Sequence, residues 1–159
     1  MKTTDLMDKY EDALTIVDTS AYQHFGHVRE FGGEMVTVKC FEDNTKAKAL
    51  LQSNGEGKVL VVDGAASRGR ALMGDNVAAI AIQNRWSGVV FNGCIRDSAD
   101  IAAMQLGVLA LGATPRRPLK LDGGETGVDL AFAGACFKPG EYIYIDDDGM
   151  LLASQALTL

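Results

Sequence analysis

The chain has 159 residues, 47% of them hydrophobic, and a formal net charge of −6. This length is enough for one domain with a sizeable core that needs no disulfides or structural metal. The acidic balance argues against direct binding of nucleic acid, because phosphate contacts need clustered Lys and Arg side chains, and Arg116, Arg117 and Lys120 are too few.

The cysteines and the N-terminus indicate where the protein works. Cys40, Cys94 and Cys136 form no CxxC pair and are odd in number, which is typical of free thiols in a reducing compartment. The first residues are polar and acidic, and no stretch approaches the roughly 18 consecutive apolar residues of a membrane helix. We expect a cytoplasmic protein that does not contact a membrane.

The first third of the chain predicts two helices and one strand. Residues 5–14 fit a short helix, and residues 35–41 alternate apolar and polar side chains as a half-buried strand does. The segment FEDN then supplies a helix cap, and residues 45–52 carry Ala47, Leu50 and Leu51 on one helical face.

A strand, a helix and a second strand follow as one βαβ unit. Residues 59–63 form a continuous apolar run that ends at Gly64, and residues 89–91 form another, so both predict buried strands. Between them, apolar residues recur at helical spacing after Asp75. If the strands are parallel, the loops that leave them emerge at the same edge of the sheet, and Asp75 converges with Arg96-Asp97.

The last third changes from helical to antiparallel patterns. Ser98 caps a predicted helix over residues 99–105, and a strand over 108–111 stops before Gly112. After Gly127, short apolar runs alternate with turns, which predicts antiparallel hairpins. We therefore predict an α/β fold and a single domain over residues 1–159.

The converging residues predict a site for a small anion. A helix N-terminus with exposed amides at Asp75, Asn76 and Val77 favours an anion by about 0.3–1 kcal/mol. Firm binding of a carboxylate would also need the Arg96 guanidinium and a divalent cation held by Asp97. The alternative is that Asp75 is only a helix cap and that Arg96-Asp97 is only a surface ion pair.

The same residues resemble the signature of a known family. Asp75, a spacer of twenty residues and Arg96-Asp97, preceded by KVLVVDG and followed by Asp100, are similar to the RraA-like family, which includes the class II 4-hydroxy-4-methyl-2-oxoglutarate aldolases. FGGEMVTVKCFEDN and EYIYIDDDGMLLAS are similar to family segments as well. The resemblance implies a swivelling β/β/α-type fold and a ring-shaped homotrimer with sites between subunits.

The resemblance also implies a mechanism. Asp97 would hold Mg²⁺ or Mn²⁺, which would bind a small 2-oxo acid, and Arg96 would stabilise the pyruvate enolate that forms when the carbon–carbon bond breaks. Asp75 would orient a water held by the metal for proton transfer. Oxaloacetate would give the same enolate by loss of CO₂, so a decarboxylase side activity is expected. The substrate-binding residues would be Gly74, Asp75, Asn76, Val77 and Arg96.

The family includes a second kind of function. Its namesake inhibits ribonuclease E by binding that protein rather than its RNA, and an acidic ring is compatible with this role. Many family aldolases carry a carboxylate on a longer C-terminal segment, whereas the last acidic side chain here is Asp148. The Asp97 carboxylate beside Arg96 favours a working metal site over a pure regulator. A metal-dependent binding protein without turnover is a third alternative.

Four other motifs have simpler interpretations. His24 and His27 have the spacing of a metal pair but are expected to be ordinary loop residues. Residues 122–127 lack the Lys-Ser/Thr of a phosphate loop and predict a flexible turn, and residues 146–149 predict a hairpin tip. Residues 64–70 are small and basic, and they either line the crevice or make a tight connection.

Overall fold

The computed structural model describes the whole chain, residues 1–159. The helices are α1 (Thr3–Tyr10), the 3-10 helix η1 (Glu11–Ala13), α2 (Thr45–Leu51), α3 (Asp75–Gln83) and α4 (Ser98–Ala102). The strands are β1 (Thr15–Val17), β2 (Gln23–His24), β3 (Phe31–Lys39), β4 (Lys58–Asp63), β5 (Gly88–Ile95), β6 (Gly107–Ala113), β7 (Glu125–Thr126), β8 (Leu130–Phe132), β9 (Ala135–Phe137), β10 (Tyr142–Ile145) and β11 (Met150–Ala153).

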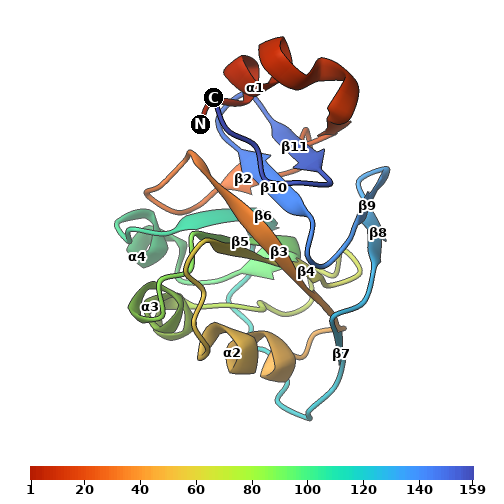
Figure 1. The fold of residues 1–159 in the computed structure, drawn as a ribbon. Helices are drawn as coiled ribbons and strands as arrows, with labels where there is room; N and C mark the ends of the chain where they lie inside the picture. The colour runs from red at the N-terminus through yellow and green to blue at the C-terminus, as the bar shows by residue number, and fades with distance from the viewer.

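Nine strands form one mixed sheet. Its order is β1-β11-β10-β3-β4-β5-β6-β2, with β7 paired to β3 outside this order. Strands β3 to β6 are parallel, and all other pairs in the sheet are antiparallel. Helices α2, α3 and α4 lie together on one side of the parallel strands, and α1 lies beside β11 near the C-terminus (Figure 1). The predicted α/β fold with a central βαβ unit and antiparallel C-terminal hairpins is confirmed.

Both faces of the central strands are buried, which explains their continuous apolar sequences. In β4, Leu60 and Val62 join the core beneath the helices, whereas Val59 and Val61 join a second core on the other face. All four side chains have 0% exposure. The second core is closed by the separate β8–β9 hairpin and by strands β10 and β11. Strands that are covered by helices on one face and by β structure on the other read as apolar runs without alternation.

Several element boundaries differ from the predicted ones. The first helix begins at Thr3 and gives way to a 3-10 turn after Tyr10, and α4 ends at Ala102. Strand β3 begins at Phe31 and includes Gly32, where an added Cβ would lie 2.6 Å from the Ile143 carbonyl oxygen. A glycine there permits close approach of the neighbouring strand and does not interrupt the pairing.

Strand β5 also runs further than predicted. It continues through Asn92 and Gly93 to Ile95, with an irregular register against β6 between Phe91 and Cys94. A bulge of this kind turns the strand and redirects the side chains that follow it. Arg96 and Asp97 follow directly after this strand.

Candidate functional site

The end of β5 and the start of α3 meet in a pocket of about 220 Å³. Residues 71–73 run beside the end of β5, where the Leu72 N–H donates to the Cys94 carbonyl at 2.8 Å and the Arg96 N–H donates to the Met73 carbonyl at 2.9 Å. These two bonds bring the start of α3 against Arg96-Asp97. The lining residues are Asn44, Lys48, Gly74, Asp75, Asn76, Val77, Arg96, Asp97, Arg117, Pro118 and Lys120.

Asp97 lies at the turn between β5 and α4 with its carboxylate aimed at α3. Its backbone is left-handed, with φ 57° and ψ 40°, and it occupies the N-cap position predicted for Ser98. Its Oδ2 accepts a hydrogen bond from the Asp75 N–H at 3.0 Å, whereas Oδ1 accepts none. A Cβ on Gly74 would lie only 2.6 Å from this Oδ2. The glycine therefore permits the contact between the helix and the carboxylate.

Arg96 has no partner in the protein. Its Nε is buried and makes no hydrogen bond, and none of the four ion pairs of the chain involves Arg96 or Asp97. The alternative of a surface ion pair is therefore wrong. Asp75 is not a side-chain cap either, since it is the first residue of α3 and the N-cap position is Gly74. A guanidinium kept free beside a helix N-terminus is available to an anionic ligand.

The first turn of α3 offers backbone donors to the same space. The Asp75 N–H is used by Asp97, but the N–H groups of Asn76 and Val77 have no acceptor in the protein. The start of an α-helix leaves such donors exposed and carries a partial positive charge. The residues predicted for the site, Gly74 to Val77 with Arg96 and Asp97, are thus together in one pocket.

The pocket also contains residues that sequence reasoning missed. Asn44 and Lys48 come from α2 and its N-cap, and Arg117 and Lys120 come from the segment after β6. Two backbone hydrogen bonds pair that segment with residues 42–44. The Leu119 N–H donates to the Glu42 carbonyl at 2.8 Å, and the Asn44 N–H donates to the Leu119 carbonyl at 3.3 Å. No periodicity in the sequence indicates this pairing.

The remaining motifs lie outside this pocket. None of residues 64–70 lines it. Of the two alternatives for this segment, lining the crevice or making a tight connection, the structure therefore favours the tight connection, in which Ala65 and Ala66 both adopt positive φ. Residues 146–149 form the tip of the β10–β11 hairpin, as predicted. The turn predicted over residues 122–127 is partly wrong, because Glu125 and Thr126 form β7 against β3.

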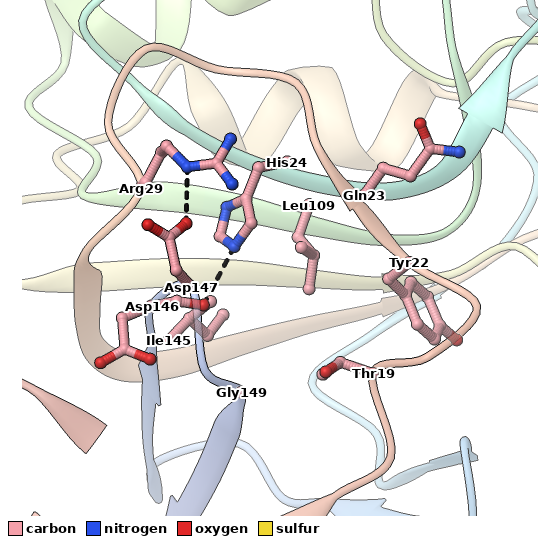
Figure 2. A pocket seen from close by; sticks show the side chains of 10 residues that line it. All are labelled: Thr19, Tyr22, Gln23, His24, Arg29, Leu109, Ile145, Asp146, Asp147 and Gly149. Atoms are coloured by element: carbon pink, nitrogen blue, oxygen red, sulfur yellow. Dashed lines mark hydrogen bonds and ion pairs between the residues drawn. The ribbon is translucent and has the colours of Figure 1, made fainter. Parts of the chain in front are cut away.

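A second pocket of about 390 Å³ contains His24 but offers no free charge (Figure 2). His24 Nε2 lies 3.0 Å from the Asp146 carbonyl oxygen, and the Arg29 Nε donates to Asp147 at 2.5 Å. His27 is exposed, and no group of three His, Cys, Asp or Glu side chains in the chain is arranged to hold a metal ion. The charged side chains that line this pocket already have hydrogen-bond partners within the protein. We therefore place the functional site at the other pocket.

The fold and the pocket define a member of the RraA-like family. The sequence profile of this family (RraA-like: Aldolase/RraA) matches residues 3–152, and the chain belongs to it. A relative from Shewanella oneidensis named "Putative 4-hydroxy-4-methyl-2-oxoglutarate aldolase" is 46% identical over 153 residues, which cover 96% of this chain and 93% of the relative.

Two solved structures share the fold over nearly the whole chain. A Geobacillus kaustophilus protein described as an S-adenosylmethionine:2-dimethylmenaquinone methyltransferase has a TM-score of 0.95 and 43% identity, covering 99% of this chain and 97% of its own. The RNA-processing inhibitor RraA from Thermus thermophilus has a TM-score of 0.94 and 36% identity, covering 99% and 95%. None of the helices combines the length and the apolar content that a membrane-spanning helix requires.

Proposed function

We propose that the protein is a divalent-metal-dependent class II aldolase that cleaves 4-hydroxy-4-methyl-2-oxoglutarate and releases pyruvate, with oxaloacetate decarboxylation as a side activity. The observation that carries the proposal is the unpaired Arg96 guanidinium beside the Asp97 carboxylate at the start of α3. The names of the curated relatives support a carbon–carbon lyase. A fold alone does not decide the reaction, so the argument depends on the pocket.

The pocket fits a hard divalent cation with few protein ligands. Asp97 is exposed, makes no ion pair and has one carboxylate oxygen without a hydrogen bond. No other His, Cys, Asp or Glu side chains complete a three-residue cluster with it. Mg²⁺ and Mn²⁺ suit carboxylate and water ligands, and Mg²⁺ retains most of its waters in such sites. Asp97 would therefore hold the ion, which supplies Lewis-acid polarisation of the 2-oxo acid when bound.

The other residues bind the substrate and stabilise the charge that develops. The Arg96 guanidinium and the free N–H groups of Asn76 and Val77 bind the carboxylate end of the 2-oxo acid. When the bond between C3 and C4 breaks, its electron pair remains on the pyruvate fragment as an enolate, and Arg96 lies beside this growing charge. Asp75 would orient a water that accepts the proton of the C4 hydroxyl as C4 becomes a carbonyl, and a proton then returns to C3 of the enolate. Loss of CO₂ from oxaloacetate leaves the same enolate.

The test is pyruvate release from 4-hydroxy-4-methyl-2-oxoglutarate and from oxaloacetate, with Mg²⁺ and then with EDTA. We expect turnover that EDTA abolishes and that Asp97→Ala and Arg96→Ala reduce at least a hundredfold, with the fold retained by circular dichroism. The matched controls are Asp100→Ala and Arg116→Ala, which change exposed residues of the same type outside the pocket. Unchanged activity in both site variants would refute the assignment.

The second candidate function is a protein regulator that binds and inhibits ribonuclease E. It is favoured by the structural match to the Thermus RraA and by the net charge of −6, which suits a basic protein partner. We propose a homotrimer for either function, with light scattering as its test. Inhibition of purified ribonuclease E by the Asp97→Ala variant, together with no turnover by the wild-type protein, would make regulation the better assignment.

Methyl transfer, which the description of the Geobacillus structure suggests, fits this pocket less well. An adenosine group needs an apolar wall for its base, and Val77 and Pro118 are the only apolar residues in the lining.

A further inference from the structure

We infer that Lys48, Arg117 and Lys120 bind the second carboxylate of the substrate and so select dicarboxylic over monocarboxylic 2-oxo acids. These three residues, called the cationic wall below, face the pocket from α2 and from the segment after β6. The inference rests on the proposed function, in which Arg96 and the start of α3 bind the first carboxylate.

The first argument is an imbalance of charge. The chain as a whole has a net charge of −6, yet its pocket is lined by four cations and only two carboxylates, Asp75 and Asp97. None of the four cations takes part in any ion pair of the chain, whereas Lys46, also in α2, pairs with Asp122 at 2.7 Å. Like charges gathered without counter-charges repel one another. The arrangement is therefore one that an anion with more than one charge would complete.

The second argument is that this pocket is where buried polar atoms lack partners. Only three buried side-chain nitrogen or oxygen atoms in the chain have no hydrogen bond, and two of them, Asn44 Oδ1 and Arg96 Nε, belong to residues of the pocket wall. The Asn44 side chain is 3% exposed, and its Nδ2 already donates to the Leu72 carbonyl at 3.0 Å. Buried polar groups are normally satisfied, so these two atoms mark the pocket as a place that a ligand completes. The donor Arg96 Nε suits a carboxylate, whereas the acceptor Asn44 Oδ1 suits a hydroxyl group or a water that accompanies the ligand.

The third argument is that the backbone that carries the cationic wall is held in place. The Asp43 carboxylate, 5% exposed, accepts hydrogen bonds from the N–H groups of Leu121 at 2.7 Å and Gly123 at 3.2 Å, and from Thr45 at 2.9 Å. Asp43 thus ties the start of α2 to the segment that carries Lys120. Lys48 lies one turn into α2, with its N–H bonded to the Asn44 carbonyl at 2.9 Å. The backbone of the cationic wall is thus fixed before binding, whereas the exposed Arg117 and Lys120 side chains become ordered when the ligand binds.

The two walls of the pocket come from different elements, so one site can bind both ends of a substrate. Arg96 and Asp97 follow β5, whereas the cationic wall belongs to α2 and to residues 117–120. A ligand anchored at Arg96 by its 2-oxo acid end presents its far end to the cationic wall. A monocarboxylic analogue would leave these cations uncompensated.

The experiment compares two unreactive ligands of similar shape by isothermal titration calorimetry with Mg²⁺ present. One is 2-oxoglutarate, and the other is 2-oxopentanoate, in which a methyl group replaces the distal carboxylate. We expect the wild-type protein to bind 2-oxoglutarate at least tenfold more tightly, and the Lys48→Met/Lys120→Met variant to lose this preference while binding 2-oxopentanoate within about twofold of the wild type. The matched control is Lys46→Met, which removes a lysine of α2 outside the pocket and should keep the preference.

Failure of the inference is distinguishable from failure of the proposed reaction. A preference for 2-oxoglutarate that disappears in the double variant supports the cationic wall even if no pyruvate is released from any substrate. Equal affinity for the two ligands in the wild-type protein, or a preference retained by the double variant, overturns it even if the aldolase reaction is fully active.

Discussion

Replacing Gly74 with alanine isolates the contact between the start of α3 and Asp97. The backbone of Gly74 has φ −119° and ψ −166°, which alanine adopts without strain. The added Cβ would lie 2.6 Å from Asp97 Oδ2 and 3.3 Å from the Arg96 Cγ and Nε, and distances under 3.0 Å to a Cβ essentially never occur. The exposed Asp97 side chain must therefore move, and its hydrogen bond with the Asp75 N–H breaks.

The size of the effect follows from that bond. A hydrogen bond to a charged group contributes about 1.5–3 kcal/mol, and the exposure of Asp97 places this one near the lower value. A loss of about 1.4 kcal/mol corresponds to a tenfold fall in kcat/KM. Because water can replace the Asp75 N–H as the partner of the exposed Asp97 carboxylate, the free energy of unfolding should fall by about 1.5 kcal/mol at most. Activity would be followed as pyruvate release coupled to lactate dehydrogenase, and stability by urea unfolding.

The matched control is Gly149→Ala. Gly149 lies at the β10–β11 turn, and nothing is within 4 Å of the position of its Cβ. We expect Gly149→Ala to match the wild type in both assays, and Gly74→Ala to lose about tenfold in activity with at most about 1.5 kcal/mol in stability. Equal activity of the two variants would refute the role assigned to this contact, and a large loss of stability in Gly74→Ala would show that the glycine serves the fold instead.

Three further outcomes are expected. Burial acts to raise the pKa of Asp43, but its hydrogen bonds outweigh burial and hold the pKa below its usual value. The contribution of Asp43 to stability is therefore present above about pH 4 and is lost as the pH falls through the lowered pKa. In urea unfolding, Asp43→Asn should destabilise the protein by about 2 kcal/mol at pH 7 and by much less at pH 3. Phe137 is fully buried, so Phe137→Ala should cost about 3–5 kcal/mol in the same assay; a cost under 1 kcal/mol would contradict the packing. Burial raises the pKa of Cys40 to about 12 and also raises that of Cys94, so iodoacetamide at pH 8 should label only the exposed Cys136, and mass spectrometry showing two labels on the folded protein would contradict this.

The boundaries that sequence reasoning missed have a common cause. The predicted strands over residues 89–91 and 108–111 end before Gly93 and Gly112, and the one over 35–41 begins after Gly32, yet all three glycines lie inside strands. An added Cβ would lie 2.6 Å from the Ile143 carbonyl oxygen at Gly32, 2.6 Å from the Arg68 guanidinium at Gly112 and 3.2 Å from the Leu72 Cδ1 at Gly93. Glycine carries the same local signal at a turn and at a close approach. Only the packing of the sheet distinguishes the two.

The sequence by itself determined the buried strands, the helix between them and the meeting of Asp75 with Arg96-Asp97. Both faces of β4 and β5 are covered, so their apolar runs are continuous, and a parallel βαβ unit brings the two strand ends to one edge of the sheet. The tertiary structure alone decided the opposite wall of the pocket. Lys48 and Lys120 are far apart in sequence and share no repeat, and they meet because backbone hydrogen bonds pair residues 42–44 with Leu119. Pairing between irregular segments depends on their three-dimensional positions, and local sequence patterns do not encode it.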